Sequence, residues 1–465
     1  MTGDRLSPLD SSFLHLEDRV SHMHIGSISI FEGPEPPFED FVAMIEGKLP
    51  LVPRYRQVVR EVPFQLERPV WVDDPDFNID YHVRHTALPT PGGEAELRSL
   101  VGRLMSQQLD RTKPLWEIYV VQGLEQGRWA MVAKTHHAMV DGVSGTELLA
   151  VIMDTSPQPS PPVADDWHPS PLPSGRRLAV EAAVQLAVSP YEQLRAIRAA
   201  TRVPRQALHQ LGEVVQGISA MAGVLRANPV STLNGPIGPH RRYAWASTSV
   251  EDVKVVRKAL GGTFNDVVLA AITDGFRELL LSRGEVVDRK VRTLVPVSVR
   301  ARDASGRAVG DSTYENKVSA MFASLPVDLE SPDERLHAIT EQMQGLKESN
   351  EAVAGEALTS LSGFAPPMLL ALGMRVAGRV QQHNINTGTT NVPGPQFPLY
   401  AAGRRMLKSY PYVPLFGQVR IAVAIFSYDG QVNFGLTGDY DSAPDLGVLC
   451  HGIEEGMGRL VELSG

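Results

Sequence analysis

The chain has 465 residues, which is too long for one ordinary hydrophobic core, so we expect two domains. Its formal net charge of −9 argues against nucleic acid as the main partner, although a local basic surface is compatible with that charge. The single cysteine, Cys450, excludes an intramolecular disulfide and a Cys-rich metal site.

The beginning of the sequence carries charges and a proline where a secretory signal peptide needs an apolar run. The longest apolar stretches, such as 366–373, are far shorter than the roughly 20 residues that span a bilayer. We therefore expect a cytoplasmic protein without a signal peptide or a transmembrane helix.

Residues 1–154 alternate strand-like and helix-like patterns, which predicts an α/β domain. The expected strands are 25–31, 117–122 and 129–135, the last two forming a hairpin, and the expected helices are 94–109 and 143–153. Seven prolines then fall between 155 and 173, which predicts an extended linker.

Residues 176–226 have a helical composition and form a basic island in an acidic chain. Its arginines are Arg176, Arg177, Arg195, Arg198, Arg202, Arg205 and Arg226. Residues 155–240 are therefore assigned to a linker and a basic helical segment, and 241–465 to a second α/β domain. That domain is expected to hold strands at 242–249, 291–298, 317–325, 418–427 and 431–437, and helices at 251–260, 264–282, 332–348 and 445–462.

The most informative residues run from His136 to Gly142, with the sequence HHAMVDG, between a predicted strand and a predicted helix. Because side chains alternate along a strand, only one of the two adjacent histidines can address a given pocket. A neutral imidazole can accept a hydroxyl proton near neutral pH and return it to a leaving thiolate. A buried pair that only holds the loop fits the spacing equally well, whereas a metal site lacks ligands other than Asp141.

HHAMVDG matches the HHxxxDG motif of the coenzyme A-dependent acyltransferases, which condensation domains and chloramphenicol acetyltransferases share. The chain resembles the bacterial wax ester synthase/diacylglycerol acyltransferases over nearly its whole length. The further motifs that carry this resemblance are LSPLDSSFLHLE at 6–17, Pro114-Leu115-Trp116, TFNDVVLAAI with Asn265 and Asp266, Val295-Pro296-Val297-Ser298 with Arg300, and Asn391-Val392-Pro393-Gly394-Pro395.

The resemblance implies two chloramphenicol-acetyltransferase-like lobes that meet at a central channel, joined by the proline-rich linker and the helical segment. It implies His137 as the general base, Asp141 as a structural residue of the loop, and His136 and Gly142 as residues that shape the same turn. Acyl-CoA is then a co-substrate, no cofactor or metal is needed, and acceptor and donor react directly.

Three motifs have both a functional and a structural interpretation. Asn265 and Asp266 either support an oxyanion or simply begin a helix. Pro114, Leu115 and Trp116 either line an acyl channel or belong to the core. The composition of 391–395 predicts a rigid turn, which the resemblance places near the channel.

The expected activity is transfer of a long-chain acyl group from acyl-CoA to diacylglycerol, and to long-chain alcohols as wax esters. The alternatives are an enzyme of the same scaffold that esterifies a polyketide-derived or glycolipid hydroxyl, and a non-catalytic lipid-binding protein. Because such acceptors are insoluble in water, we expect peripheral contact with a membrane or lipid-droplet surface. The basic segment is either the docking element or a helical hairpin that packs on the lobes and exposes its arginines to water.

Overall fold

The computed structural model describes residues 4–139, 151–184, 232–298, 318–348 and 385–465. The helices are α1 (Pro8–Leu16), α2 (Phe38–Glu46), α3 (Ile79–His82), α4 (Glu94–Met105), α8 (Val250–Leu260), α9 (Phe264–Ser282), α10 (Pro332–Glu348) and α13 (Leu446–Glu462). The strands are β1 (His24–Phe31), β2 (Gln57–Arg60), β3 (Val70–Asp73), β4 (Val83–Ala87), β5 (Trp116–Leu124), β6 (Arg128–His136), β7 (Arg241–Ser249), β8 (Val291–Ser298), β9 (Val318–Leu325), β10 (Thr387–Pro393), β11 (Tyr400–Ala401), β12 (Arg404–Tyr412), β13 (Ile421–Tyr428) and β14 (Gln431–Asp439).

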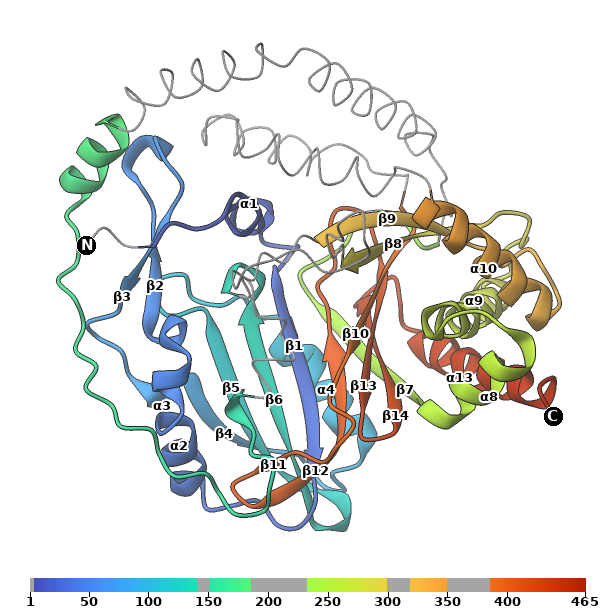
Figure 1. Ribbon diagram of the computed structural model, residues 1–465, viewed down its shortest axis with the longest axis horizontal. Coiled ribbons are helices and arrows are strands. Elements are labelled where there is room, and N and C mark those ends of the chain that lie inside the picture. The colour runs from blue at the N-terminus through green and yellow to red at the C-terminus, as the bar shows by residue number, and fades with distance from the viewer. Residues whose placement is uncertain (1–3, 140–150, 185–231, 299–317, 349–384) are drawn as a thin grey trace, which may run out of the picture.

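The described strands form two six-stranded mixed sheets, which confirms the predicted α/β class with two lobes (Figure 1). The first sheet has the order β11-β12-β1-β6-β5-β4, and the second has the order β7-β14-β13-β10-β8-β9. A separate two-stranded sheet, β2-β3, extends from the first lobe.

The first sheet is covered on both faces, as the alternation along β6 shows. Trp129 and Met131 face a core that includes Phe41 and Ile45 of α2. Ala130 and Val132, which alternate with them, face a different core that includes α4. Because successive side chains of a strand point to opposite faces, this alternation decides which side each histidine at the end of β6 takes.

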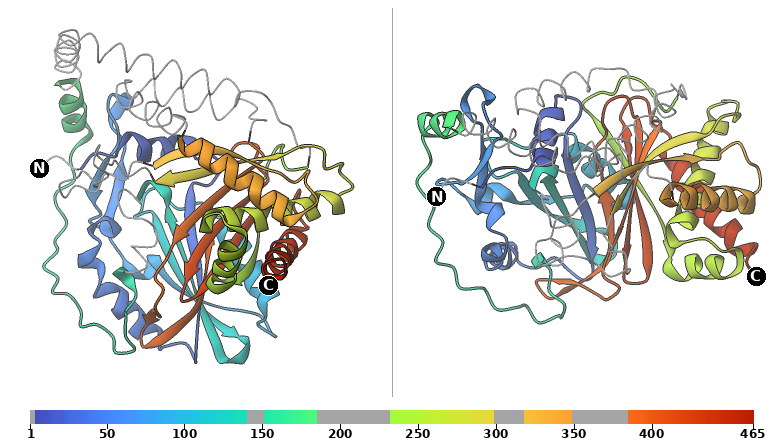
Figure 2. Two further views of the ribbon diagram at one scale, coloured as in Figure 1. Left: turned by 45° about the vertical axis from the view of Figure 1, so that its right-hand side comes forward. Right: turned by 45° about the horizontal axis from the view of Figure 1, so that its top comes forward.

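The second sheet is packed on one face against α8, α9, α10 and α13, which Figure 2 shows as a layer on the outer side of that lobe. α9 is buried along most of its length, as its apolar sequence VVLAAI predicts. Thr263 is its N-cap, also as predicted, and accepts a hydrogen bond from the Asp266 backbone N–H.

The boundary at residue 241 does not separate the two sheets. β11 and β12, which belong to the segment assigned to the second lobe, pair with β1 and complete the first sheet. β12 also carries Tyr410, which stacks on Trp245 of β7 with ring centroids 4.9 Å apart. The segment assigned to the second lobe therefore contributes two strands to the first sheet and an aromatic contact between the lobes. Short-range sequence patterns reveal neither.

The proline-rich linker was expected to cross from one lobe to the other, and this expectation is wrong for its described residues. The Val163 backbone N–H donates to the Gly47 carbonyl, and Arg56 forms an ion pair with Asp165. The helix over 175–184 then packs Leu178 and Ala182 against β2 and β3. Residues 155–184 thus remain on the first lobe, because their apolar and charged partners lie there.

Two further expectations concern local structure. Asn391, Val392 and Pro393 form the end of β10, a strand parallel to β13, so the predicted turn begins only at Gly394. Most of the helix expected over 143–153 lies outside the described residues, as do 185–231 of the basic segment. Within the described ranges, no helix is both long and apolar enough to cross a membrane.

Candidate active site

His137 follows directly on β6 and opens a short 3₁₀ helix, His137–Met139. Its backbone N–H donates to the Met23 carbonyl at 2.8 Å, which holds the turn against the start of β1. Its ring stacks on Phe13 of α1, with centroids 3.9 Å apart and planes inclined by 25°. The motif at 6–17 and the histidine motif therefore meet face to face.

The surroundings of His137 keep its imidazole neutral. Desolvation by burial and, to a smaller extent, the nearby His136 lower the pKa of His137 to about 4, although a hydrogen bond to its own backbone opposes them. At neutral pH the ring is therefore free of the proton that would prevent it from acting as a base.

His136 takes the opposite face of the sheet and is fully buried. Its Nδ1 accepts a hydrogen bond from the Ala138 backbone N–H at 3.1 Å, which assigns the ring proton to Nε2. That Nε2 lies 3.6 Å from Oε2 of Glu17. His136 thus ties the turn after β6 to the segment that follows α1.

Glu17 is a site residue that the sequence analysis did not single out, although it is the last residue of the motif at 6–17. Arg111 donates to its Oε2 from Nε at 2.8 Å. Desolvation by burial raises the pKa of Glu17, but the nearby His136 and the hydrogen-bonded Arg111 outweigh it and lower the pKa to about 2. The Glu17 carboxylate is therefore ionised at neutral pH and lies next to His136.

Asn265 and Asp266 lie in the first turn of α9, and the structure gives them different tasks. Asp266 is buried, and its Oδ2 accepts from the Thr263 backbone N–H at 2.8 Å, so its carboxylate completes a capping box. Asn265 is half-buried and accepts from Nδ2 of Asn391 at 3.3 Å. Two motifs far apart in the sequence, TFND and NVPGP, are joined by this amide pair.

Pro114, Leu115 and Trp116 are buried in the core. The Trp116 indole N–H donates to the Tyr55 carbonyl at 2.8 Å, and its ring stacks on His82. The Leu115 carbonyl accepts from the His136 backbone N–H at 2.9 Å. These contacts support the structural interpretation, in which the motif braces β5 against the histidine pair.

Asp141 and Gly142 lie outside the described residues, so their partners are not part of this geometry. Among the described residues, no hydrogen bond or ring contact joins His137 to Asn265 or Asp266. In the same ranges, no three histidine, cysteine or acidic side chains converge in the way that a metal ion needs.

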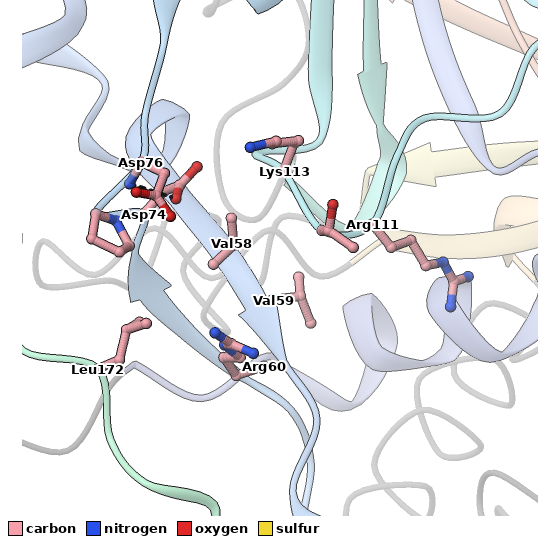
Figure 3. A pocket seen from close by; sticks show the side chains of 10 residues that line it. Val58, Val59, Arg60, Asp74, Asp76, Arg111, Lys113 and Leu172 are labelled. Carbon is pink, nitrogen blue, oxygen red and sulfur yellow. Dashed lines mark hydrogen bonds between the residues drawn. The ribbon is translucent and has the colours of Figure 1, made fainter.

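A cavity of about 230 Å³ opens beside β2 (Figure 3), and its lining does not include His137. Its lining brings Val58 and Val59 of β2 together with the charged side chains of Asp74, Asp76 and Lys113. The Arg111 side chain extends away from these valines, which agrees with its bond to Glu17.

Two models of one protein family match most of the chain. The wax ester synthase/diacylglycerol acyltransferase catalytic domain matches residues 6–268, and the C-terminal domain of the same family matches residues 314–460. The chain belongs to the wax ester synthase/diacylglycerol acyltransferase family. It is therefore an acyltransferase, and its histidine motif lies in the catalytic domain.

Relatives of similar length support this assignment. A probable diacylglycerol O-acyltransferase, tgs1, of Mycobacterium tuberculosis is 38% identical over 467 residues, covering 99% of this chain and 96% of the relative. A second from the same species, tgs2, is 31% identical, covering 99% and 100%.

Solved structures agree with the two-lobed fold. The wax ester synthase/diacylglycerol acyltransferase of Marinobacter aquaeolei VT8 is similar, with a TM-score of 0.67, 27% identity, and coverage of 99% of this chain and 100% of that chain. The first condensation domain of the calcium-dependent antibiotic synthetase has a TM-score of 0.59 at 17% identity, covering 100% and 96%, and shows the fold alone.

Proposed function

We propose that the protein transfers a long-chain acyl group from acyl-CoA to the free hydroxyl of diacylglycerol, which yields triacylglycerol and free coenzyme A. The observation that carries this proposal is the neutral His137, stacked on Phe13 and backed by His136, in a chain of the acyltransferase family. The names of the mycobacterial relatives, which match over nearly their full length, support diacylglycerol as the acceptor.

In this mechanism His137 is the general base. It accepts the proton of the acceptor hydroxyl as that oxygen attacks the thioester carbonyl. The tetrahedral intermediate then expels the coenzyme A thiolate, which takes the proton from the imidazolium. The ester C–O bond forms, the C–S bond breaks, and the base is returned to its starting state without an acyl-enzyme.

The low pKa of His137 shapes this chemistry. Burial weakens the imidazole as an equilibrium base, but it also ensures that the ring is unprotonated at every pH well above 4. The acid that forms transiently is correspondingly strong, so it readily protonates the departing thiolate. The reaction needs neither a resident cofactor nor a metal in this proposal.

Stabilisation of the tetrahedral oxyanion is assigned to the second lobe. The Asn265 amide is half-buried at the N-terminus of α9, where unpaired N–H groups and the positive end of the helix favour negative charge. Its bond to Asn391 holds the amide in place. In this proposal the amide faces the tetrahedral intermediate from the second lobe, while His137 acts on it from the first.

The Marinobacter relative supports long-chain alcohols as a second class of acceptor, since its name includes wax ester synthase. A glycolipid or polyketide-derived hydroxyl remains the alternative on the same scaffold. The three acceptor classes differ in product mass, so one assay separates them.

The test supplies palmitoyl-CoA with diacylglycerol, hexadecanol and a trehalose-based glycolipid, each dispersed in detergent, and identifies products by mass spectrometry. Triacylglycerol should form fastest, with stoichiometric release of coenzyme A. Exclusive formation of wax ester or acylated glycolipid would reject diacylglycerol as the acceptor, and release of coenzyme A without any ester would reject the transferase.

A further inference from the structure

The tip of the β2–β3 hairpin exposes an aromatic side chain. Phe64 is 85% exposed, and both Phe64 and Gln65 have left-handed backbone conformations, with φ of 57° and 52°. That conformation costs a non-glycine residue about 1 kcal/mol or more, and the exposed ring gains nothing from the protein core. An exposed aromatic on a strained turn is a feature that a contact outside the chain explains.

The helix over 175–184 extends this apolar surface. Its inner face packs Leu178 and Ala182 against the hairpin, whereas Val180 and Val184, one turn apart, are 56% and 57% exposed. A side chain built on Gly175 would meet Pro63, the neighbour of Phe64, at 3.6 Å. The hairpin tip and the start of the helix are thus adjacent, as Figure 1 also shows.

Basic side chains accompany this surface. Arg60 at the end of β2 and Arg176 in the helix are exposed, and no ion pair joins either of them to a described residue. The other charges of the hairpin tip (61–68) and of the helix pair with each other, Arg68 with Glu67 and Arg177 with Glu181, which leaves the exposed Glu61. In a chain of net charge −9, a local excess of positive charge suits an anionic partner.

The surface is connected to the active site through backbone pairing. Arg5 bridges to Val70 of β3, and the Leu6 N–H donates to the Pro69 carbonyl. The chain then enters α1, whose Phe13 stacks on His137. The hairpin is therefore only one helix away from the proposed base, on the side of the first lobe that bears α1 (Figure 1).

We propose that Phe64, Val180 and Val184 insert into an anionic phospholipid surface, with Arg60 and Arg176 at the level of the headgroups. This docking surface rests on the proposed function, because a diacylglycerol acceptor must be taken from a lipid phase. Amphipathic surfaces of this kind, with aromatic and aliphatic side chains flanked by arginine, bind at the boundary of headgroups and acyl chains.

The test measures binding of the full-length protein to vesicles of phosphatidylcholine with phosphatidylglycerol, by flotation. Burial of one phenylalanine ring corresponds to roughly tenfold in partitioning, so Phe64→Ser should weaken binding by about that factor. Loss of each arginine should weaken binding roughly fivefold at low salt, so Arg60→Gln with Arg176→Gln should also abolish most of the salt dependence.

Matched controls lie on the second lobe. Val286 is 82% exposed, and Val286→Ser should bind as the parent protein does. Lys254→Gln with Lys258→Gln removes two exposed charges from α8 and should change vesicle binding little. All variants should keep the parent rate on detergent-dispersed diacylglycerol, because none of these residues is part of the site.

Equal vesicle binding by the parent and Phe64→Ser would overturn the docking surface, as would binding that depends on Phe64 only at pure triacylglycerol droplets. Failure of the proposed function looks different. In that case the parent protein makes no triacylglycerol even from detergent-dispersed acceptor, whatever its affinity for vesicles.

Discussion

At the histidine pair, two identical side chains have opposite surroundings. His137 stacks on an aromatic ring and loses its proton readily, whereas His136 points its Nε2 toward an ionised carboxylate. His136 is the last residue of β6, whereas His137 opens the 3₁₀ helix, and the partners of both histidines come from the segment 13–17. The position of His137 therefore depends on how His136, its neighbour in the chain, is held by Glu17.

Glu17 is expected to act as a positioning residue. Glu17→Gln keeps the shape of the side chain but removes the charge that faces Arg111 and His136. The turn that bears His137 should lose its anchor, and kcat should fall roughly tenfold to a hundredfold, because small misplacements of a base are costly. KM for palmitoyl-CoA should change much less.

Steady-state kinetics in detergent provide the measurement. Glu17→Asp, which retains the charge, should recover part of kcat, and Glu39→Gln, an exposed change on α2, should have no effect. A Glu17→Gln protein with the parent kcat would show that the carboxylate does not position the histidines.

At the scale of elements, α9 carries a structural residue next to the residue that is proposed to support the oxyanion. Its first turn holds Asp266 in a capping box and leaves the Asn265 amide paired with Asn391. α8 begins with the same device, in which Ser249 and Asp252 exchange hydrogen bonds with each other's backbone. The two helices therefore form a natural comparison.

Asp266→Ala should lower the free energy of unfolding by about 1 kcal/mol, and Asp252→Ala should lower it by a similar amount, since each removes one capping bond. Urea unfolding followed by circular dichroism measures both. Asp266→Ala should also reduce activity because Asn265 shifts with the helix start, whereas Asp252→Ala should not. An Asp266→Ala protein of unchanged stability would contradict the capping role.

At the scale of the whole molecule, the two lobes are joined by contacts that close over long sequence separations. β12 pairs with β1 in the first sheet, and Gly435 of β14 lies so close to β12 that an added side chain would collide with the Pro411 carbonyl. The Tyr243 hydroxyl donates to the same carbonyl. The two lobes are therefore packed tightly against each other where β14 and β7 meet β12.

Local pattern was sufficient to predict most elements from the sequence. The hairpins β5–β6 and β13–β14 join strands that are adjacent in the chain, and α9 is a long apolar helix with a clear N-cap. The path of the linker along the first lobe and the pairing of β12 within the first sheet were not predictable from local pattern. Both depend on packing between segments that are distant in the sequence.

The same distinction applies to the site. The motif HHAMVDG indicated His136 and His137 because the spacing itself is distinctive. The approach of Glu17 and Phe13 to these histidines has no local signal, since α1 and β6 are separated by most of the first lobe. Trp116 also needed the structure, because an apolar residue fits a core and a channel equally well.

The role of His137 as the general base is tested most directly by the rate of acyl transfer by His137→Ala. Formation of triacylglycerol from palmitoyl-CoA and detergent-dispersed diacylglycerol should fall by on the order of 10²–10⁴-fold, the usual contribution of general-base catalysis. The circular dichroism spectrum should stay that of the parent, and His451→Ala, an exposed change on α13, should keep full activity. Turnover close to that of the parent in a folded His137→Ala protein would contradict the mechanism.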